Sequence, residues 1–389
     1  MEKVLTSSEF KRYNRHLILE QVGPAGQEKL KQSHVLLLGA GGLGSPAALY
    51  LVAAGIGKLT IIDFDTVDET NLQRQVLYTS SDVGKKKIAV ATRRLLDLNP
   101  YVEIISFEER FSVENARKIL SSVDLVVDGS DNFPTRYLLN DACVLSQKPF
   151  IHGSIFKFEG LLSVFNYQSG PCYRCLYPEP PSPDSVPSCN EAGVLGVLPG
   201  VIGSLQATEA VKLILGIGRV ASGRVISYDA LQLKFRDFTV ARDPGCPACG
   251  DNPKLRELRE LSEYCLPGNT HLAKEVSMSD NPSNEFEIDV ESYKKLRDAG
   301  TKHILLDVRE EYETDISSID DSVLIPLGEL ESKLETLDQN AYYIVYCRSG
   351  NRSDTAVKMM REHGIEHVKN LVGGINEWAE KIDITLPMY

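Results

Sequence analysis

The sequence has no long apolar run and no secretory pattern at its start. No stretch approaches the roughly 18 apolar residues of a membrane-spanning helix. Residues 1–16, MEKVLTSSEFKRYNRH, are charged and lack the apolar centre of a signal peptide. We therefore expect a cytoplasmic protein that has no membrane partner.

Basic residues are in the minority. Lysine and arginine number 42 against 54 acidic residues, which gives a formal net charge of −12. A chain with this balance is repelled as a whole by nucleic acids and anionic surfaces, so we expect no nucleic-acid partner. Hydrophobic residues at 42% and charged residues at 25% are typical of a folded globular protein.

Internal repeats are absent, and the eight cysteines do not have the arrangement of a secreted disulfide framework. Two C-x-x-C pairs plus single cysteines are more typical of metal and thiol chemistry. A chain of 389 residues is too long for one ordinary core. We predict a first domain over residues 1–265, a linker over 266–284 and a second domain over 285–389.

The stretch from His34 to Asp65 has the pattern of a nucleotide-binding βαβ unit. A short apolar run is followed by Gly39, Gly41 and Gly44 and then by an alanine-rich helix. Asp63 ends the next apolar run, about 20 residues after Gly44, where such a unit places the acid that binds a ribose hydroxyl. The pattern alone does not distinguish NAD, FAD and ATP.

The alternation of strands and helices after Asp63 predicts an α/β fold with a mostly parallel, doubly wound sheet. Ligands of such sheets bind beyond the carboxyl ends of the strands, which is where Asp131 is expected. Arg74, Lys87 and Arg136 could neutralise a triphosphate, and Asp131 could hold Mg²⁺. Taken singly, Arg74 and Lys87 could be surface charges, and Asp131 could cap the helix that follows it.

Two helical segments are expected outside this unit. Residues 7–32 form a polar, helix-prone lead-in, with Ser7 or Ser8 as N-cap and a break at Gly23-Pro24. Residues 252–265 are helical in pattern.

Cys172, Cys175, Cys246 and Cys249 form the two C-x-x-C pairs. Four thiolates are the complete ligand set of a closed, tetrahedral structural zinc site. The pairs lie far apart in the sequence, so the fold would have to bring them together. The alternative is two redox-active cysteine pairs.

Cys347 follows a short apolar strand and precedes a helix. Main-chain N–H groups of a tight loop, the helix N-terminus, Arg348 and Arg352 would all favour a thiolate there. In a phosphatase, the loop would have an arginine six positions after the cysteine, but that position is Ser353. Sulfur transfer is therefore favoured over phosphate hydrolysis.

The remaining cysteines carry weaker signals. Cys189 lies in a proline-rich segment and is either a loop thiol with a function or only an exposed residue. Cys143 and Cys265 are expected to serve packing.

The motifs together resemble two known families. Residues 7–265 resemble the E1-like adenylating enzymes that activate the sulfur carriers of molybdopterin synthase and of thiamin synthesis. The shared motifs are GAGGLGS, DFDTVDETNLQRQ, DGSDNFPTR, CYRC, CPAC and TEAVKLILG. Residues 285–389 resemble a rhodanese domain through DVREEYE, CRSGNRS and LVGGINEW.

The first resemblance implies a set of roles in ATP binding. ATP would lie on the loop from Gly39 to Gly44, Asp63 would bind the ribose, and Asp131 would bind Mg²⁺. The family works as a homodimer in which the residue matching Arg15 reaches the partner's nucleotide, although the pattern by itself indicates only a solvated helix face. The remaining nucleotide contacts would come from Gly41, Gly42, Arg74, Lys87, Asn132 and Arg136.

The two resemblances also imply a reaction. A ubiquitin-like, β-grasp sulfur carrier would present its C-terminal Gly-Gly carboxylate for adenylation. A persulfide on Cys347 would attack the product, and Cys189 would resolve the acyl-disulfide to leave a thiocarboxylate. The sulfur would come from an upstream donor such as a cysteine desulfurase or thiosulfate.

Two other outcomes remain. Cys189 could form a thioester, so that the carrier is conjugated to proteins. The chain could also be an NAD-dependent oxidoreductase joined to a non-catalytic rhodanese-like module.

Overall fold

A computed structural model describes residues 5–181, 193–261 and 286–389. Contacts divide the chain into two compact units, Met1–Asn269 and Thr270–Tyr389. The predicted linker, 266–284, lies outside the described residues, so its limits stay a prediction.

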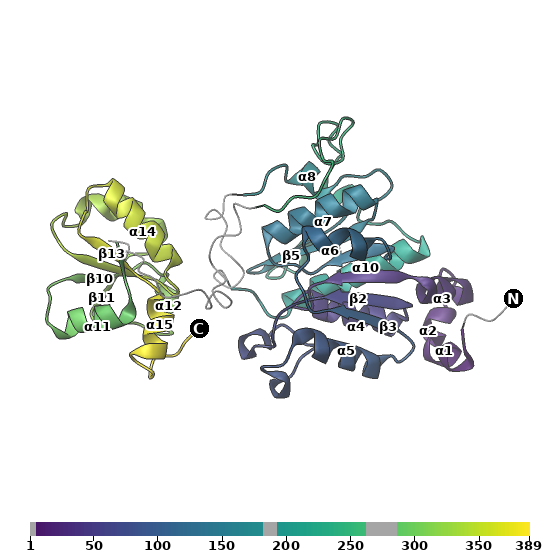
Figure 1. Ribbon diagram of the computed structural model, residues 1–389, viewed down its shortest axis with the longest axis horizontal. Coiled ribbons are helices and arrows are strands. Elements are labelled where there is room, and N and C mark those ends of the chain that lie inside the picture. Colours follow the sequence, from purple (N-terminus) through teal and green to yellow (C-terminus); the bar gives the residue numbers. More distant parts are fainter. Residues whose placement is uncertain (1–4, 182–192, 262–285) are drawn as a thin grey trace. The chain divides into compact units, whose positions relative to one another are not determined.

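The larger unit contains one eight-stranded sheet (Figure 1). Its spatial order is β3-β2-β1-β4-β5-β6-β7-β8, in which β3 to β5 are parallel and β6 to β8 continue the sheet antiparallel. The strands are β1 (His34–Leu38), β2 (Lys58–Ile62), β3 (Glu103–Phe107), β4 (Leu125–Asp128), β5 (Phe150–Phe156), β6 (Glu159–Phe165), β7 (Arg224–Asp229) and β8 (Lys234–Thr239).

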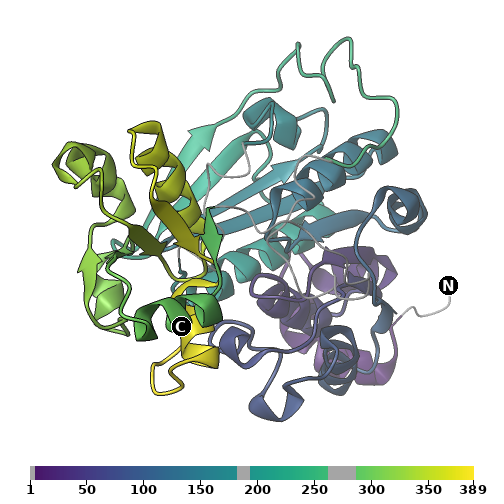
Figure 2. The ribbon, with the colours of Figure 1, turned by 60° about the vertical axis from the view of Figure 1, so that its left-hand side comes forward.

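Helices cover both faces of this sheet (Figures 1 and 2). They include α1 (Ser7–Arg12), α2 (Asn14–Leu17), α3 (Gly23–Gln32), α4 (Gly44–Ala54), α5 (Lys87–Leu98), α6 (Val113–Leu120), α7 (Phe133–Ser146), α8 (Tyr173–Leu176) and α10 (Leu198–Leu215). Short 3₁₀ helices η1 (Glu69–Asn71) and η2 (Ser80–Asp82) lie between β2 and α5.

Strand β1 shows why the sheet is buried on both sides. Val35 and Leu37 pack into the core formed with α3, α4, α5 and α10, whereas Leu36 and Leu38 pack into the core formed with α6 and α7. Successive side chains of a strand point to opposite faces, so a strand with helices on both sides must be apolar throughout.

The direction in which the chain adds strands to the sheet reverses between β1 and β4. From β1 the chain moves outward through β2 to β3 and then returns to place β4 on the other side of β1. In a doubly wound sheet this switch point opens a crevice at the carboxyl ends of the two strands, where ligands bind. The predicted mostly parallel α/β fold is confirmed.

The smaller unit contains a five-stranded parallel sheet, ordered β11-β10-β12-β13-β9. One core includes residues of α13 and α14, and the other includes residues of α11 and α15. The elements are β9 (Glu287–Ile288), α11 (Val290–Asp298), β10 (Ile304–Asp307), α12 (Glu311–Thr314), β11 (Ser322–Leu324), α13 (Leu327–Lys333), η4 (Leu334–Thr336), β12 (Tyr343–Tyr346), α14 (Asn351–Glu362), β13 (Val368–Leu371) and α15 (Gly374–Lys381).

Three expectations about helices were wrong. Thr6, not Ser7 or Ser8, caps α1 through a capping box with Glu9, and Gly23-Pro24 begins α3 instead of interrupting a helix. Proline is well tolerated in the first helical turn because its missing N–H would have no partner there. Residues 252–261 are not helical, although Leu258 and Leu261 of this segment pack against the core beneath α6 and α7.

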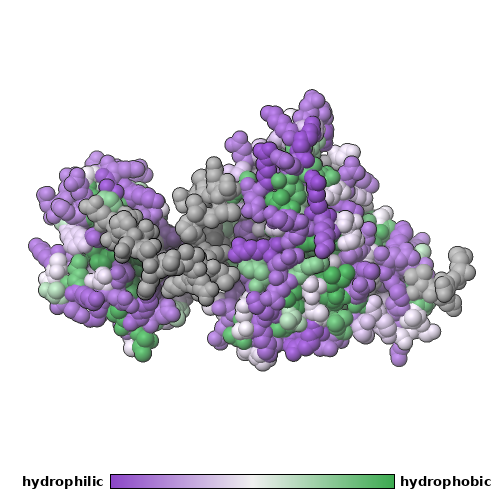
Figure 3. Space-filling model, in the orientation of Figure 1, coloured by the Kyte–Doolittle hydropathy of each residue, from purple (hydrophilic) through white to green (hydrophobic). Residues whose placement is uncertain are grey.

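Within the described part of the chain, no helix combines the length and the apolar composition needed to cross a membrane. On the face shown in Figure 3, hydrophilic residues predominate and hydrophobic ones form smaller patches.

Candidate functional site

The glycine loop lies between β1 and α4, at the switch point of the larger sheet. Gly39 has a φ of +86°, and a Cβ on Gly44 would lie 1.9 Å from the carbonyl oxygen of Gly39. No other residue fits at Gly44 without moving the backbone. The turn therefore brings the N-terminus of α4, with its unpaired N–H groups and partial positive charge, to the crevice.

Asp63 fastens this loop to the end of β2. Its Oδ2 accepts the N–H of Ala40 at 2.8 Å, and its Oδ1 accepts the N–H of Asp65 at 2.8 Å. Burial raises the pKa of Asp63, although the charge of Lys87 opposes the shift. The carboxylate lies beside the glycine loop, as the sequence predicted.

The loop after β2 brings two of the predicted cations to the same region. A Cβ on Gly42 would lie 3.8 Å from Cδ of Arg74, so this side chain passes directly beside the glycine loop. Lys87 is buried, and its Nζ lies 2.9 Å from Oδ2 of Asp65. Both cations are thus held near the place expected for phosphates.

Sequence reasoning missed Gln75. This buried residue lies beside Gly41, because a Cβ there would be 3.6 Å from Gln75 Nε2. Its Nε2 donates to Asn71 Oδ1 at 2.6 Å, while its Oε1 is buried and has no hydrogen-bond partner. Buried polar atoms are rarely left unpaired, so Oε1 is suited to accept a hydrogen bond from a ligand. Gln75 is the last residue of the motif DFDTVDETNLQRQ, but no residue spacing in the sequence distinguishes it from its neighbours.

The end of β4 forms the other side of the crevice. A Cβ on Gly129 would lie 2.9 Å from the Leu38 carbonyl oxygen and 3.0 Å from that of Gly39. The predicted magnesium ligand, Asp131, follows as an exposed residue. Asn132, and not Asp131, caps α7, because its side chain accepts the N–H of Thr135 at 3.0 Å.

Arg136 lies on the first turns of α7 and points back to the β4 end. Its NH2 group donates to the Ser130 carbonyl oxygen at 3.1 Å, while its Nε is buried without a partner. The third predicted cation therefore lies at the β4 side of the crevice.

A buried dyad beneath this turn was not predicted. Asp128 accepts hydrogen bonds from the N–H and Oγ of Ser130, and its Oδ2 lies 2.9 Å from Nδ1 of His152. Burial lowers the pKa of His152, although Asp128 opposes this shift. Burial would raise the pKa of Asp128, but the interaction with His152 lowers it below its ordinary value. No residue pattern in the sequence distinguished this pair.

Arg15 is exposed on α2. Arg15 is not among the residues described above that contact the glycine loop. Cys189 lies outside the described residues, and so does Cys265. Cys143 is fully buried in the core beneath α6 and α7, and burial raises the pKa of its thiol.

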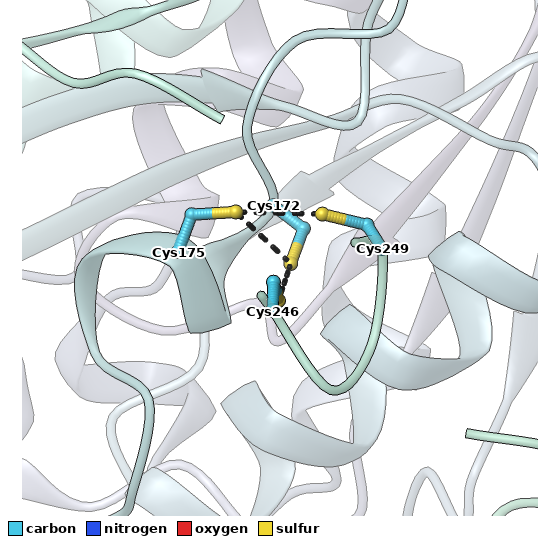
Figure 4. Close-up of side chains that lie close together, drawn as sticks. All are labelled: Cys172, Cys175, Cys246 and Cys249. Atoms are coloured by element: carbon cyan, nitrogen blue, oxygen red, sulfur yellow. Dashed lines mark hydrogen bonds between the residues drawn. The ribbon is translucent and has the colours of Figure 1, made fainter. Parts of the chain in front are cut away.

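The four cysteines of the C-x-x-C pairs converge (Figure 4). Their sulfur atoms all lie within 4.8 Å of one another, and three pairs are 3.4, 3.6 and 3.9 Å apart. Zinc–sulfur bonds of about 2.3 Å in tetrahedral geometry place sulfur atoms about 3.8 Å apart. The cluster therefore has the donors and the spacing to bind a metal ion.

Cys347 lies on a tight turn at the carboxyl end of β12, the central strand of the smaller sheet. Its Sγ accepts the N–H of Gly350 at 3.1 Å and the Oγ–H of Ser353 at 3.4 Å. Gly350 has a φ of +103° and begins α14. The loop thus directs donors at the sulfur, as expected for a nucleophile on a strand-to-helix turn.

Arg352, on the helix that follows this loop, forms an ion pair with Glu313. Both terminal nitrogens of Arg352 donate to Glu313, at 2.6 and 2.7 Å. Burial would lower the pKa of Arg352, but Glu313 and the nearby Cys347 raise it. Arg352 therefore supports the loop as a member of an ion pair.

The fold and these sites define a chain that joins a nucleotide-binding domain to a rhodanese-type thiol domain. The model of the ThiF family matches residues 13–248, and that of the rhodanese-like domain matches residues 289–381. The chain belongs to the ThiF family and carries a C-terminal rhodanese-like domain, which confirms the resemblance seen in the sequence.

Relatives cover the whole chain or its larger part. "Adenylyltransferase and sulfurtransferase MOCS3" of Culex quinquefasciatus is 41% identical, over 99% of this chain and 90% of its own length. "Sulfur carrier protein adenylyltransferase" of Thermus thermophilus is 54% identical, over 67% of this chain and 98% of its own. The crystal structure of Escherichia coli MccB with ATP matches with a TM-score of 0.54 and 25% identity, over 64% of this chain and 77% of that one.

Proposed function

We propose that this adenylyltransferase and sulfurtransferase activates the C-terminal Gly-Gly carboxylate of a ubiquitin-like sulfur carrier with ATP and then replaces AMP with sulfur from Cys347. One observation carries the proposal: the same chain has a glycine turn at the switch point of its larger sheet and a hydrogen-bonded thiol at the end of β12. Relatives named for both activities support it.

The first step uses the crevice between β1 and β4. ATP lies on the loop from Gly39 to Gly44, with its ribose on Asp63. The carrier carboxylate attacks the α-phosphorus, the bond to the β-phosphate breaks, and pyrophosphate leaves. The negative charge that develops on the phosphates is stabilised by Arg74, Lys87 and Arg136. MccB, crystallised with ATP, supports this assignment.

Asp131 is the residue we propose for Mg²⁺. Its carboxylate is exposed at the end of β4, and Asn132 lies beside it, with Nδ2 3.2 Å from Asp131 Oδ1. An oxygen donor in this place fits the ligand preference of Mg²⁺. A bound Mg²⁺ would neutralise phosphate charge.

The second step uses the thiol of Cys347 after a donor, a cysteine desulfurase or thiosulfate, has converted it to a persulfide. The outer sulfur attacks the carbonyl carbon of the acyl-adenylate, and AMP leaves. A thiolate, for which we propose Cys189, then attacks the inner sulfur of the acyl-disulfide. The carrier thiocarboxylate leaves, and a dithiol reductant then reduces the resulting Cys189–Cys347 disulfide to two thiols and is itself oxidised to a disulfide.

We propose zinc for the four-cysteine cluster, with a structural role. Cys172 is the N-cap of α8 and Cys175 lies within this helix, whereas Cys246 and Cys249 belong to a segment far away in sequence. An ion bound by all four thiolates would link the two segments and leave no open coordination position. We also propose a cytoplasmic location, because C-x-x-C pairs that bind a metal are more typical of a reducing compartment than of secreted proteins.

We propose a homodimer in which Arg15 serves the partner's nucleotide. Arg15 is exposed on α2, and the next residues include Ile18 and Leu19, which are 67% and 50% exposed. Apolar side chains beside an exposed arginine are suited to contact with a second copy.

The proposal is tested with the full chain, ATP, a Gly-Gly-ending carrier and a sulfur donor, followed by mass analysis of the carrier. Wild type should yield the thiocarboxylate, whereas Cys347→Ala should yield only the adenylate. A carrier attached to the enzyme by a thioester, with no thiocarboxylate, would instead favour conjugation. Thiocarboxylate from Cys347→Ala, with no other sulfur source able to act on the adenylate, would refute the role of Cys347.

A further inference from the structure

Tyr389 lies against the Cys347 loop although it is distant from it in sequence. The guanidinium carbon of Arg348 lies 5.3 Å from the centre of the Tyr389 ring. Asn376 holds the backbone of Tyr389, because its Nδ2 donates to the Tyr389 carbonyl oxygen at 3.1 Å. The N–H of Asn376 also donates to the Arg348 carbonyl oxygen at 3.1 Å. One residue of α15 therefore fixes Tyr389 and the loop to each other.

The hydroxyl of Tyr389 makes a second connection. It donates to Oε1 of Glu313 at 3.1 Å and accepts a hydrogen bond from NH1 of Arg309. Glu313 in turn forms the ion pair with Arg352 of α14. The phenol thus connects the side chains of the buried Arg309 and of Glu313, in addition to the direct hydrogen bond from Arg309 NH1 to the Glu313 carbonyl oxygen at 3.3 Å.

The guanidinium groups of the three arginines around the loop have different contacts. The charge of Arg309 is met by Asp307, at 2.6 Å with both side chains fully buried, and that of Arg352 is met by Glu313. Arg348 is half-buried, and its guanidinium lies over the Tyr389 ring, a contact that cation–π attraction stabilises. Tyr389 therefore contributes to the position of the Arg348 charge beside the loop.

We propose that Tyr389 is a positioning residue for sulfur transfer at Cys347. Its ring holds the guanidinium of Arg348 beside the loop, where this charge attracts anionic sulfur donors and acceptors. This inference rests on the proposed role of Cys347 as the sulfur-carrying thiol.

The test compares the alkylation of Cys347 by anionic iodoacetate and by neutral iodoacetamide in the full chain. The rate is measured by mass spectrometry on the peptide that contains Cys347, so that other cysteines do not contribute. The ratio of the two rates reports the local positive field, whereas a general loss of structure would change both rates together.

Tyr389→Ala should lower the iodoacetate-to-iodoacetamide ratio about 2- to 5-fold, the effect of letting the partly screened charge of Arg348 move away from the thiol. Tyr389→Phe keeps the ring and should keep the ratio. Tyr312→Ala is the matched control, since Tyr312 is next to Glu313 but is 65% exposed. It should behave as wild type.

An unchanged ratio in Tyr389→Ala would overturn the inference while leaving the role of Cys347 intact. So would an equal change in both rates. A wild-type Cys347 that neither reagent modifies would refute the proposed reactive thiol itself. The two failures are therefore distinguishable.

Discussion

At the residue scale, the least expected feature is the buried pair of Asp128 and His152. The pair lies directly beneath the turn that carries Asp131, and Asp128 also binds Ser130 in that turn. Gln206 of α10 adds a hydrogen bond of 2.6 Å from Nε2 to the Asp128 carbonyl oxygen. The turn that carries the residue we propose for magnesium is thus held by groups buried beneath it.

Because of the buried pair of Asp128 and His152, we expect the free energy of unfolding of the larger unit to depend on pH. The pKa of His152 is lowered by burial from its ordinary 6.5, so below that pH the unfolded chain binds a proton that the folded chain does not. Stability should fall as the pH drops from 6.5, by at most about 1.4 kcal/mol per pH unit from this group.

Urea unfolding of the larger unit at about pH 7 and about pH 5.5 would measure the loss. His152→Asn, which keeps a donor for Asp128, should reduce the difference between the two conditions. His363→Asn, at an exposed position, should leave it unchanged. Equal pH dependence in all three proteins would contradict the assignment to His152.

At the element scale, the turn from β1 to α4 is determined by steric fit. Gly44 allows no Cβ, whereas a Cβ on Gly41 would meet its nearest atom, Gln75 Nε2, at 3.6 Å, an ordinary contact. The two glycines therefore have different reasons to be there, although they look alike in the motif.

Gly44→Ala should destabilise the larger unit by about 1–3 kcal/mol or more, since the backbone must move to relieve the overlap. Gly41→Ala should change stability by much less. Thermal unfolding of the two variants gives the comparison. The steric explanation is wrong if both variants have the melting temperature of the wild type, or if Gly41→Ala is less stable than Gly44→Ala.

The cysteine cluster is a second feature at this scale, because it ties α8 to the segment around Cys246. Cys246→Ser should reduce the zinc content of the purified full chain and lower its melting temperature. Cys143→Ala should keep its zinc, because Cys143 lies in a different core. Elemental analysis measures the zinc content of each protein. A wild-type chain that contains no zinc when purified without chelators would refute the zinc site.

At the scale of the whole molecule, two sheets with separate cores place two chemistries in one chain. The residues that we propose for nucleotide binding lie in the larger unit, and Cys347 lies in the smaller one.

We therefore expect the two activities to be lost independently. Asp131→Ala should abolish carrier-dependent exchange of pyrophosphate into ATP but keep the reaction of Cys347 with a sulfur donor. Cys347→Ala should show the reverse pattern. Exchange assays and mass analysis of the persulfide would measure the two steps, and loss of both activities from either variant would contradict this separation.

Much of the fold was predictable because its signals are local. The glycine spacing, the apolar strands and the cysteine on a strand-to-helix turn each depend on residues that are neighbours in sequence. The helix predicted over residues 252–265 shows the limit of local reasoning, because its described part, 252–261, is not helical. Leu258 in this part is buried by tertiary packing and not by helical periodicity.

The sequence by itself determined the nucleotide turn at Gly39 to Gly44, the thiol site at Cys347 and the ligand types of the cysteine pairs. Only the tertiary structure decided which distant groups meet: Asp128 with His152, Gln75 with the glycine loop, the two cysteine pairs, and Tyr389 with Arg348. The physical reason is that these contacts form when strands and helices pack together. Packing depends on the whole chain, so residue spacing carries no record of it.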